Sequence, residues 1–103
     1  MTILENVSVN AKANIYFDGK CISYTITLAD LSKCTVGIIF NGLFEFNTDR
    51  AELMKIVSGE CRVKLMGAKG WVTYNQGQEF SVPKSSSFEI EVSELLHYIC
   101  HYE

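Results

Sequence analysis

The sequence predicts an all-β domain, either a β-sandwich or a jelly-roll β-barrel. Runs in which apolar and polar residues alternate recur roughly every 8–12 residues, and turn residues separate them. No segment shows a convincing long helical period. With 103 residues, of which 48% are hydrophobic, the chain is long enough for one core. A parallel α/β fold needs crossover helices, for which this sequence has no room.

Four strands are predicted in the first half of the chain, at residues 14–17, 21–28, 35–40 and 43–48. In the second of them Ile22, Tyr24 and Ile26 fall on one face, because side chains alternate along a strand. The third strand is apolar on both faces, as expected for a strand that is covered on both sides. The dipeptide Asn41-Gly42 then predicts a tight hairpin between the third and fourth strands.

Six further strands are predicted in the second half, at residues 52–58, 61–66, 71–74, 80–83, 88–92 and 97–102. Turn residues, mainly Gly, Ser and Asn, separate them. Only residues 48–55 are also compatible with one or two helical turns. About ten short strands with regular turns predict a single sandwich or barrel.

The composition limits the possible partners. A formal net charge of −3 without a cluster of Lys or Arg disfavours nucleic-acid binding. No stretch approaches the roughly 18–20 apolar residues of a membrane-spanning helix, which argues against a membrane partner. Residues 1–13 lack the basic start and apolar run of a signal peptide. Because Cys21, Cys34, Cys61 and Cys100 are far apart, we expect reduced thiols in the cytoplasm.

Two segments resemble the paired signatures of the cupin jelly roll. Glu52 is followed after six residues by Gly59, and Gly77 after five residues by Pro83. In metal-binding cupins, histidines precede the glutamate and follow the proline. Those positions are occupied here by Phe46, Thr48 and Phe88. These side chains cannot hold a transition metal, so we expect a metal-free site with an aromatic interior. The competing interpretation is that the phenylalanines only fill the core.

A closer resemblance emerges from motifs that occur together in a distinctive order. They lie at residues 14–20, 36–37, 42–48, 52–59, 80–83, 86–88 and 98–102. Together they resemble the small cupin-fold pyrimidine/purine nucleoside phosphorylases over residues 14–102. The resemblance implies a cupin-like jelly-roll β-barrel domain at residues 14–103, and it leaves residues 1–13 as an N-terminal arm.

The resemblance also implies an activity. The family splits purine and pyrimidine nucleosides with inorganic phosphate as co-substrate, and gives the free base and α-D-ribose 1-phosphate. It has a broad substrate range, uses no metal or other cofactor and is generally homodimeric. Some members carry Arg where this chain has Lys33 and His101. Lysine and histidine lack the guanidinium fork, so these departures weaken a bidentate grip on phosphate.

Candidate site residues follow from this chemistry, since phosphorolysis passes through a cationic sugar and needs phosphate beneath the anomeric carbon. The catalytic candidates are Glu52 and His101, the phosphate-binding candidates are Lys33 and Thr35, and the nucleoside-binding candidates are Phe46, Thr48, Trp71, Phe88 and Tyr98. Aromatic stacking tolerates any base, which suits a broad substrate range. Lys33 as a solvated turn residue and Trp71 as a barrel cap or subunit contact remain competing interpretations.

Two other functions remain open. The first is a non-catalytic cupin that binds a sugar or nucleotide ligand. The second is a metal-dependent cupin dioxygenase or isomerase. A chelate of His97, Cys100 and His101 is disfavoured, because the two histidines would lie roughly 13 Å apart on a strand with Cys100 on the opposite face.

Overall fold

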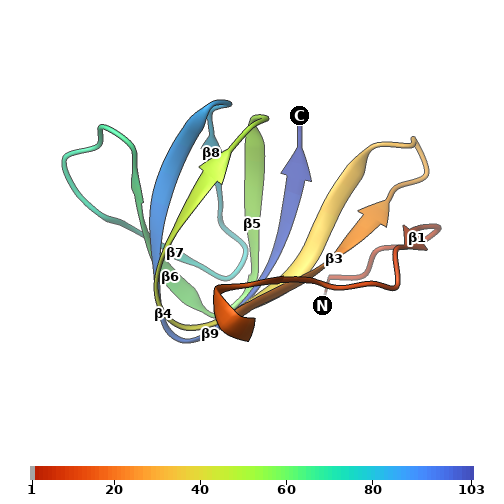
Figure 1. The fold of residues 1–103 in the computed structure, drawn as a ribbon, viewed down its shortest axis with the longest axis horizontal. Helices are drawn as coiled ribbons and strands as arrows, with labels where there is room; N and C mark the ends of the chain where they lie inside the picture. The colour runs from red at the N-terminus through yellow and green to blue at the C-terminus, as the bar shows by residue number, and fades with distance from the viewer. Residues whose placement is uncertain (1) are drawn as a thin grey trace.

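The computed structural model describes residues 2–103, and it confirms the all-β class (Figure 1). The strands are β1 (Ser8–Val9), β2 (Asn14–Tyr16), β3 (Cys21–Thr27), β4 (Lys33–Thr48), β5 (Glu52–Ser58), β6 (Glu60–Leu65), β7 (Val72–Asn75), β8 (Glu79–Val82) and β9 (Ser86–Tyr102). A single 3₁₀ turn, η1 (Phe17–Gly19), follows β2. Within the described residues no helix is long and apolar enough to cross a membrane.

The two longest strands, β4 and β9, organise the molecule. They pair antiparallel along almost their whole length, with a shift of register between Phe40 and Gly42. Figure 1 shows both strands curving through the bottom of the view, so that each supplies one half to each of two walls. The first wall contains β3, the start of β4, the end of β9, β5 and β8. The second wall contains the end of β4, the start of β9, β6 and β7.

The hairpin predicted at Asn41-Gly42 is wrong. The chain continues through these residues as one strand, because β9 is the partner of β4 on both sides of them. The register shift is a bulge at which Gly42 adopts a φ of 151°. A bulge of this kind bends a strand without ending its pairing. The predicted strands at 88–92 and 97–102 likewise merge into β9.

The helical alternative for residues 48–55 is also wrong. Residues 49–51 form a short connection between the two walls, and β5 begins at Glu52. The alternation of Glu52, Met54 and Ile56 directs these side chains to one face of β5, which requires an extended backbone. Tertiary pairing with β8 and β9 therefore decides the conformation of this segment.

The sheet is not closed into a barrel by hydrogen bonds, which corrects the predicted jelly-roll barrel in this respect. β7 pairs with β6, and β8 pairs with β5, but no ladder joins these two successive strands. The two walls therefore face each other as a partly open sandwich.

The main core lies between the walls. Its buried side chains include Ile39, Ile56, Val63, Ile90 and Leu96. A second, smaller cluster lies on the outer face of the first wall, around Ile26, Cys34 and Ile99. The N-terminal residues Leu4 and Val7 pack against this second cluster, and β1 pairs with the end of β3. The segment that precedes the predicted domain thus contacts its outer surface.

Candidate functional site

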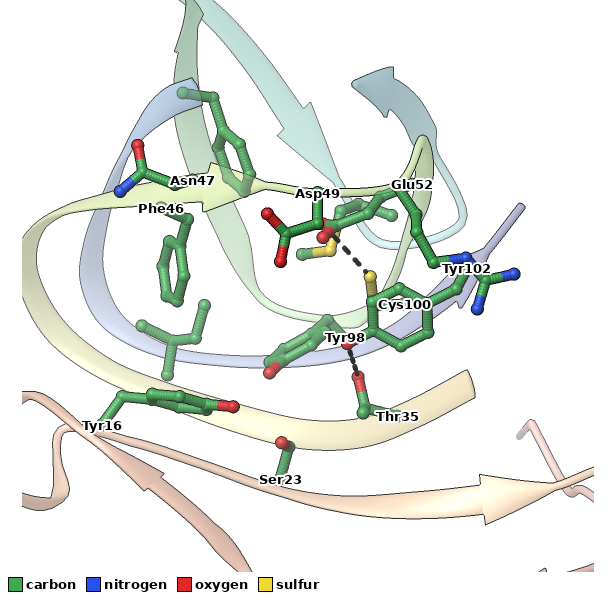
Figure 2. Close-up of a pocket in the computed structure, with 14 residues that line it drawn as sticks. Tyr16, Ser23, Thr35, Phe46, Asn47, Asp49, Glu52, Tyr98, Cys100 and Tyr102 are labelled. Atoms are coloured by element: carbon green, nitrogen blue, oxygen red, sulfur yellow. Dashed lines mark hydrogen bonds between the residues drawn. The ribbon is translucent and has the colours of Figure 1, made fainter. Parts of the chain in front are cut away.

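A cavity of about 330 Å³ lies between the two walls (Figure 2). Its volume is within the range of about 300–1,000 Å³ that is usual for small-molecule sites. The lining residues are Tyr16, Ser23, Thr35, Ile39, Phe46, Asn47, Asp49, Arg50, Glu52, Met54, Phe88, Tyr98, Cys100 and Tyr102. The aromatic side chains thus leave a space between the walls and do not fill it completely.

One end of the cavity is polar. Thr35 on β4 lies beside Cys100 on β9, and Glu52 on β5 lies beside Tyr102. The hydroxyls of Thr35 and Tyr102 hydrogen-bond at 3.4 Å. The Cys100 thiol donates to Oε1 of Glu52 at 3.4 Å, and Figure 2 marks both bonds. Three neighbouring strands therefore present hydroxyl, thiol and carboxylate groups to one space.

The protonation states at this end follow from burial. Loss of solvent raises the pKa of Glu52, and the hydrogen bond from Cys100 partly opposes this effect. Burial raises the pKa of Tyr102 to about 12. Burial also raises the pKa of Cys100, and the Glu52 charge adds to the effect. The thiol and the phenol therefore remain protonated donors around a single partly buried acid.

Tyr98 lies on the same face of β9. Its hydroxyl is 3.6 Å from the Cys21 sulfur, and it also interacts with the Ser23 hydroxyl. Burial raises the pKa of Tyr98 well above the ordinary phenol value. Tyr98 thus presents a neutral hydroxyl whose position is fixed by β3.

The other end of the cavity is aromatic. Phe46 on β4 and Phe88 on β9 are directly opposite in register, and their rings stack with centroids 5.5 Å apart and planes 19° from parallel. Phe17 of η1 packs edge-on against Phe46, with ring centroids 5.2 Å apart. Phe88 is only 3% exposed, and both stacked rings line the cavity. A flat, aromatic surface borders the cavity at this end.

The connection between β4 and β5 supplies charged groups that sequence reasoning missed. Asp49 and Arg50 line the cavity, and Figure 2 shows the Asp49 carboxylate directed into it. Arg50 is exposed, and its Nε donates to a main-chain oxygen of Glu103 at 3.0 Å. The signal in the sequence was the pair of charges Asp49-Arg50, which only Ala51 separates from Glu52.

The structure brings five of the predicted site residues together. Thr35, Phe46, Glu52, Phe88 and Tyr98 all line the cavity. Alternation along β4, β5 and β9 explains this convergence, because these residues occupy inward positions on paired strands. Their individual roles stay predictions.

The other four predicted residues do not line the cavity. The Thr48 hydroxyl is buried, donates to the Pro83 carbonyl at 2.6 Å and accepts from the Ser86 amide at 3.0 Å. Thr48 therefore fixes the turn before β9. The Lys33 ammonium is exposed and donates to the Thr27 hydroxyl at 3.1 Å.

Trp71 and His101 contact other surfaces. The Arg62 guanidinium lies 5.2 Å from the Trp71 ring centre and also pairs with Glu91 on the outer side of the second wall. His101 follows Cys100 on β9 and so points to the opposite face. Its pKa is lowered, first by burial and then by Lys55. Cys100 and His101 therefore lie on opposite faces of β9, as the sequence predicts.

No group of three His, Cys, Asp or Glu side chains within residues 2–103 is arranged to hold a metal ion. The cavity offers one thiol and two carboxylates among hydroxyl, amide and aromatic groups. The absence of a metal from the reaction stays a prediction.

Comparisons with known proteins identify relatives of this chain. The family model described as pyrimidine/purine nucleoside phosphorylase matches residues 11–102. A protein of that name from Cupriavidus metallidurans is 53% identical over 102 residues, which cover 99% of each chain. The crystal structure of an Acinetobacter protein of unknown function has a TM-score of 0.96 and 42% identity, and the match covers 98% of each chain.

A more distant structure shares the fold alone. The EutQ protein of Clostridium difficile superimposes with a TM-score of 0.65 at 16% identity, covering 80% of this chain and 61% of that one. The open, cupin-like sandwich is therefore a known architecture. The match over nearly the whole length shows that this chain belongs to the pyrimidine/purine nucleoside phosphorylase family.

Proposed function

We propose that the protein catalyses phosphorolysis of purine and pyrimidine nucleosides in the cavity between its walls. The observation that carries the proposal is the division of one cavity into an aromatic end and a hydroxyl-rich, acidic end. A nucleoside has the same division, with a flat base joined to a polar sugar. Membership of the family supports the same reaction.

At the aromatic end, the Phe46 ring, supported by Phe88, would contact the base. Stacking depends on a π-face, which every base has, and contributes roughly 1–3 kcal/mol per base. Tyr98 and Ser23 offer hydroxyls nearby that can donate or accept. This combination favours a broad substrate range over recognition of one base edge.

At the polar end, Glu52 would face the sugar. As the C1′–N bond lengthens, positive charge develops on the ribose ring, and a nearby carboxylate stabilises it. Asp49 supplies a second carboxylate that can accept hydrogen bonds from ribose hydroxyls. Burial strengthens these electrostatic interactions because water screens them less.

Phosphate would bind between Arg50 and Thr35. The guanidinium donates two parallel hydrogen bonds to phosphate oxygens, and the Thr35 hydroxyl donates a third. In the reaction a phosphate oxygen forms a bond to C1′ while the C1′–N bond breaks. The bonding electrons pass to the base nitrogen, which takes up a proton from the solvent or from phosphate. The products are the free base and α-D-ribose 1-phosphate.

The proposal is tested by incubating the protein with uridine or inosine, with and without phosphate. We expect phosphate-dependent release of free base and the appearance of ribose 1-phosphate by phosphorus NMR. Release that persists equally without phosphate contradicts phosphorolysis. Thermal stabilisation by nucleosides without turnover supports instead the non-catalytic, ligand-binding alternative.

A second arm of the experiment identifies the phosphate-binding cation. Arg50 lines the cavity, whereas Lys33, the cation expected from the sequence, contacts Thr27 outside it. Arg50→Gln should raise the KM for phosphate about tenfold or more, because at least one charge-assisted hydrogen bond is lost, and Lys33→Gln should leave it nearly unchanged. The reverse result assigns phosphate binding to Lys33.

We further propose that the protein is a cytoplasmic homodimer. All four cysteines are free, which suits a reducing compartment. On the outer face of the first wall an apolar groove runs along Tyr24, Val36 and Val57, and Tyr24 is 42% exposed. A second copy that covers this groove would bury the apolar surface.

A further inference from the structure

Cys100 is a buried thiol in the polar end of the cavity to which the proposed reaction gives no role. It is 3% exposed and lies on β9 between Thr35 of β4 and Met54 of β5. Its sulfur is 3.4 Å from Oε1 of Glu52, which lies diagonally across from it on β5. Figure 2 shows the thiol directed at the carboxylate.

The direction of this hydrogen bond is determined by the two groups. An ionised carboxylate only accepts hydrogen bonds, and a thiol that is protonated donates. Burial and the Glu52 charge both raise the pKa of Cys100, so the thiol keeps its proton at neutral pH. The proton therefore lies on sulfur and points to Glu52.

The bond occupies one oxygen of Glu52. Among the described residues, Cys100 is the side-chain donor that the structure provides for this carboxylate, and it contacts Oε1. Oε2 is consequently available to a ligand in the cavity. Within residues 2–103 Cys100 supplies the side-chain hydrogen bond to Glu52, whereas the cross-strand partner Tyr102 hydrogen-bonds Thr35 and also interacts with Cys100.

We propose that Cys100 is a positioning residue, whose thiol fixes the rotamer of Glu52 and favours its ionised form. The inference rests on the proposed function, because it assigns Glu52 to the sugar. The thiol takes no part in bond making or breaking. The Thr35 hydroxyl hydrogen-bonds the Tyr102 phenol beside this pair.

Other ionisable groups near Glu52 must be considered in any titration. Those that line the same cavity are Asp49 and Arg50 of the β4–β5 connection, Tyr16 of β2, and Tyr98, Cys100 and Tyr102 of β9. β8 presents the apolar Val82 opposite Glu52. Asp49 and Arg50 are unchanged in the variants below, so their effect cancels in the comparison.

The test measures the titration of Glu52 directly, by carbon NMR of protein labelled at the glutamate side-chain carboxyl, with Glu52→Gln to assign the signal. Cys100→Ala removes the donor and should move the midpoint to higher pH, because the ionised form loses its hydrogen bond. Cys100→Ser keeps a donor and should leave the midpoint at or below that of the unmodified protein. Cys61→Ala removes a buried thiol outside the cavity lining and should not change the midpoint.

An unchanged midpoint in Cys100→Ala overturns the proposal, as does an equal rise in Cys100→Ser. Should the alanine variant not fold, Cys100→Val removes the donor while filling the space, and the same outcomes apply. With uridine and phosphate, Cys100→Ala should lower kcat/KM about tenfold and move the acid limb of its pH profile upward, and Cys100→Ser should restore both.

The NMR titration tests the role of Cys100, and the enzymatic assay tests the proposed function independently of it. The titration needs no turnover. If the midpoint of Glu52 shifts in Cys100→Ala but the protein has no phosphorylase activity, only the proposed function is wrong. If the protein turns over nucleosides but the midpoint of Glu52 does not shift in Cys100→Ala, only the role of Cys100 is wrong.

Discussion

At the scale of single residues, the site depends on Glu52, an acid placed where solvent is largely replaced by protein. Burial raises its pKa because the charged form loses hydration, and the Cys100 thiol restores part of that loss. Around it, the hydroxyls of Thr35 and Tyr102 keep their protons. A carboxylate under these conditions interacts strongly with a developing positive charge, at the expense of protein stability.

Glu52→Gln should therefore lower the activity but raise the stability of the protein. Because the pKa is raised in the folded state, burial of the ionised form opposes folding, and the variant should unfold at a higher temperature at pH 7. The gain in unfolding temperature should shrink as the pH falls through the folded-state pKa of Glu52 towards the ordinary carboxyl value. Over this range the carboxyl group becomes protonated first in the folded state and then also in the unfolded state, so its charge is lost in both. Calorimetry at several pH values checks this.

The same variant should lose about 100-fold or more in kcat/KM, as is usual when charge stabilisation of a transition state is removed. Glu45→Gln is the matched control, because Glu45 lies on the second wall outside the cavity lining. Equal activity of both variants would remove Glu52 from the reaction.

At the scale of elements, β4 and β9 position the site because each crosses from one wall to the other. Thr35 and Phe46 both belong to β4, on opposite sides of the bulge at Gly42. Phe88, Tyr98 and Cys100 are distributed along β9 in the same way. The bend in two paired strands thus brings the aromatic and polar ends of one cavity together.

The turn between β5 and β6 lies against β9 close to this bend. Gly59 has a φ of 98°, and a Cβ there would lie 2.4 Å from the Leu95 carbonyl oxygen of β9. Gly67 has a similar φ of 82°, but nothing lies within 4 Å of its Cβ position. Both substitutions by alanine strain the backbone, and only Gly59→Ala also clashes.

Gly67→Ala should accordingly cost about 1–2 kcal/mol of unfolding free energy. Gly59→Ala should cost several kcal/mol, because the obstructing atom is backbone and cannot rotate away. Urea denaturation of the two variants measures the difference. Equal losses would mean that the close approach to Leu95 does not constrain the turn.

At the scale of the whole molecule, the chain is an open sandwich with two different faces. Between the walls lies the cavity, and on the outside of the first wall lies an apolar surface that residues Leu4 and Val7 partly cover. The groove beside Tyr24 continues this surface.

The proposed dimer is tested by introducing a charge at the centre of its proposed interface. Tyr24→Glu should shift the mass in solution from two chains to one, because a carboxylate buried against apolar side chains loses its hydration. Val72→Glu introduces the same charge at a similarly exposed position on the second wall and should leave the mass unchanged. Analytical ultracentrifugation distinguishes the two, and a Tyr24→Glu protein that remains dimeric would exclude this face.

The sequence by itself determined the class of fold and most of the strands, because period-two alternation reports which face of a strand is buried. It also placed Glu52, Thr35, Phe46, Phe88 and Tyr98 among the site residues, and all five line the cavity. Motif order indicated the family, since motifs are local features of the chain.

Only the tertiary structure decided what depends on pairing between distant segments. Asn41-Gly42 bends β4 and does not reverse it, because β9 supplies hydrogen bonds on both sides. Long-range packing likewise leaves Lys33 and Trp71 outside the cavity and brings in Asp49, Arg50 and the Cys100 thiol. A residue's local pattern fixes the direction of its side chain, but which side chains meet depends on the register of β4, β5 and β9.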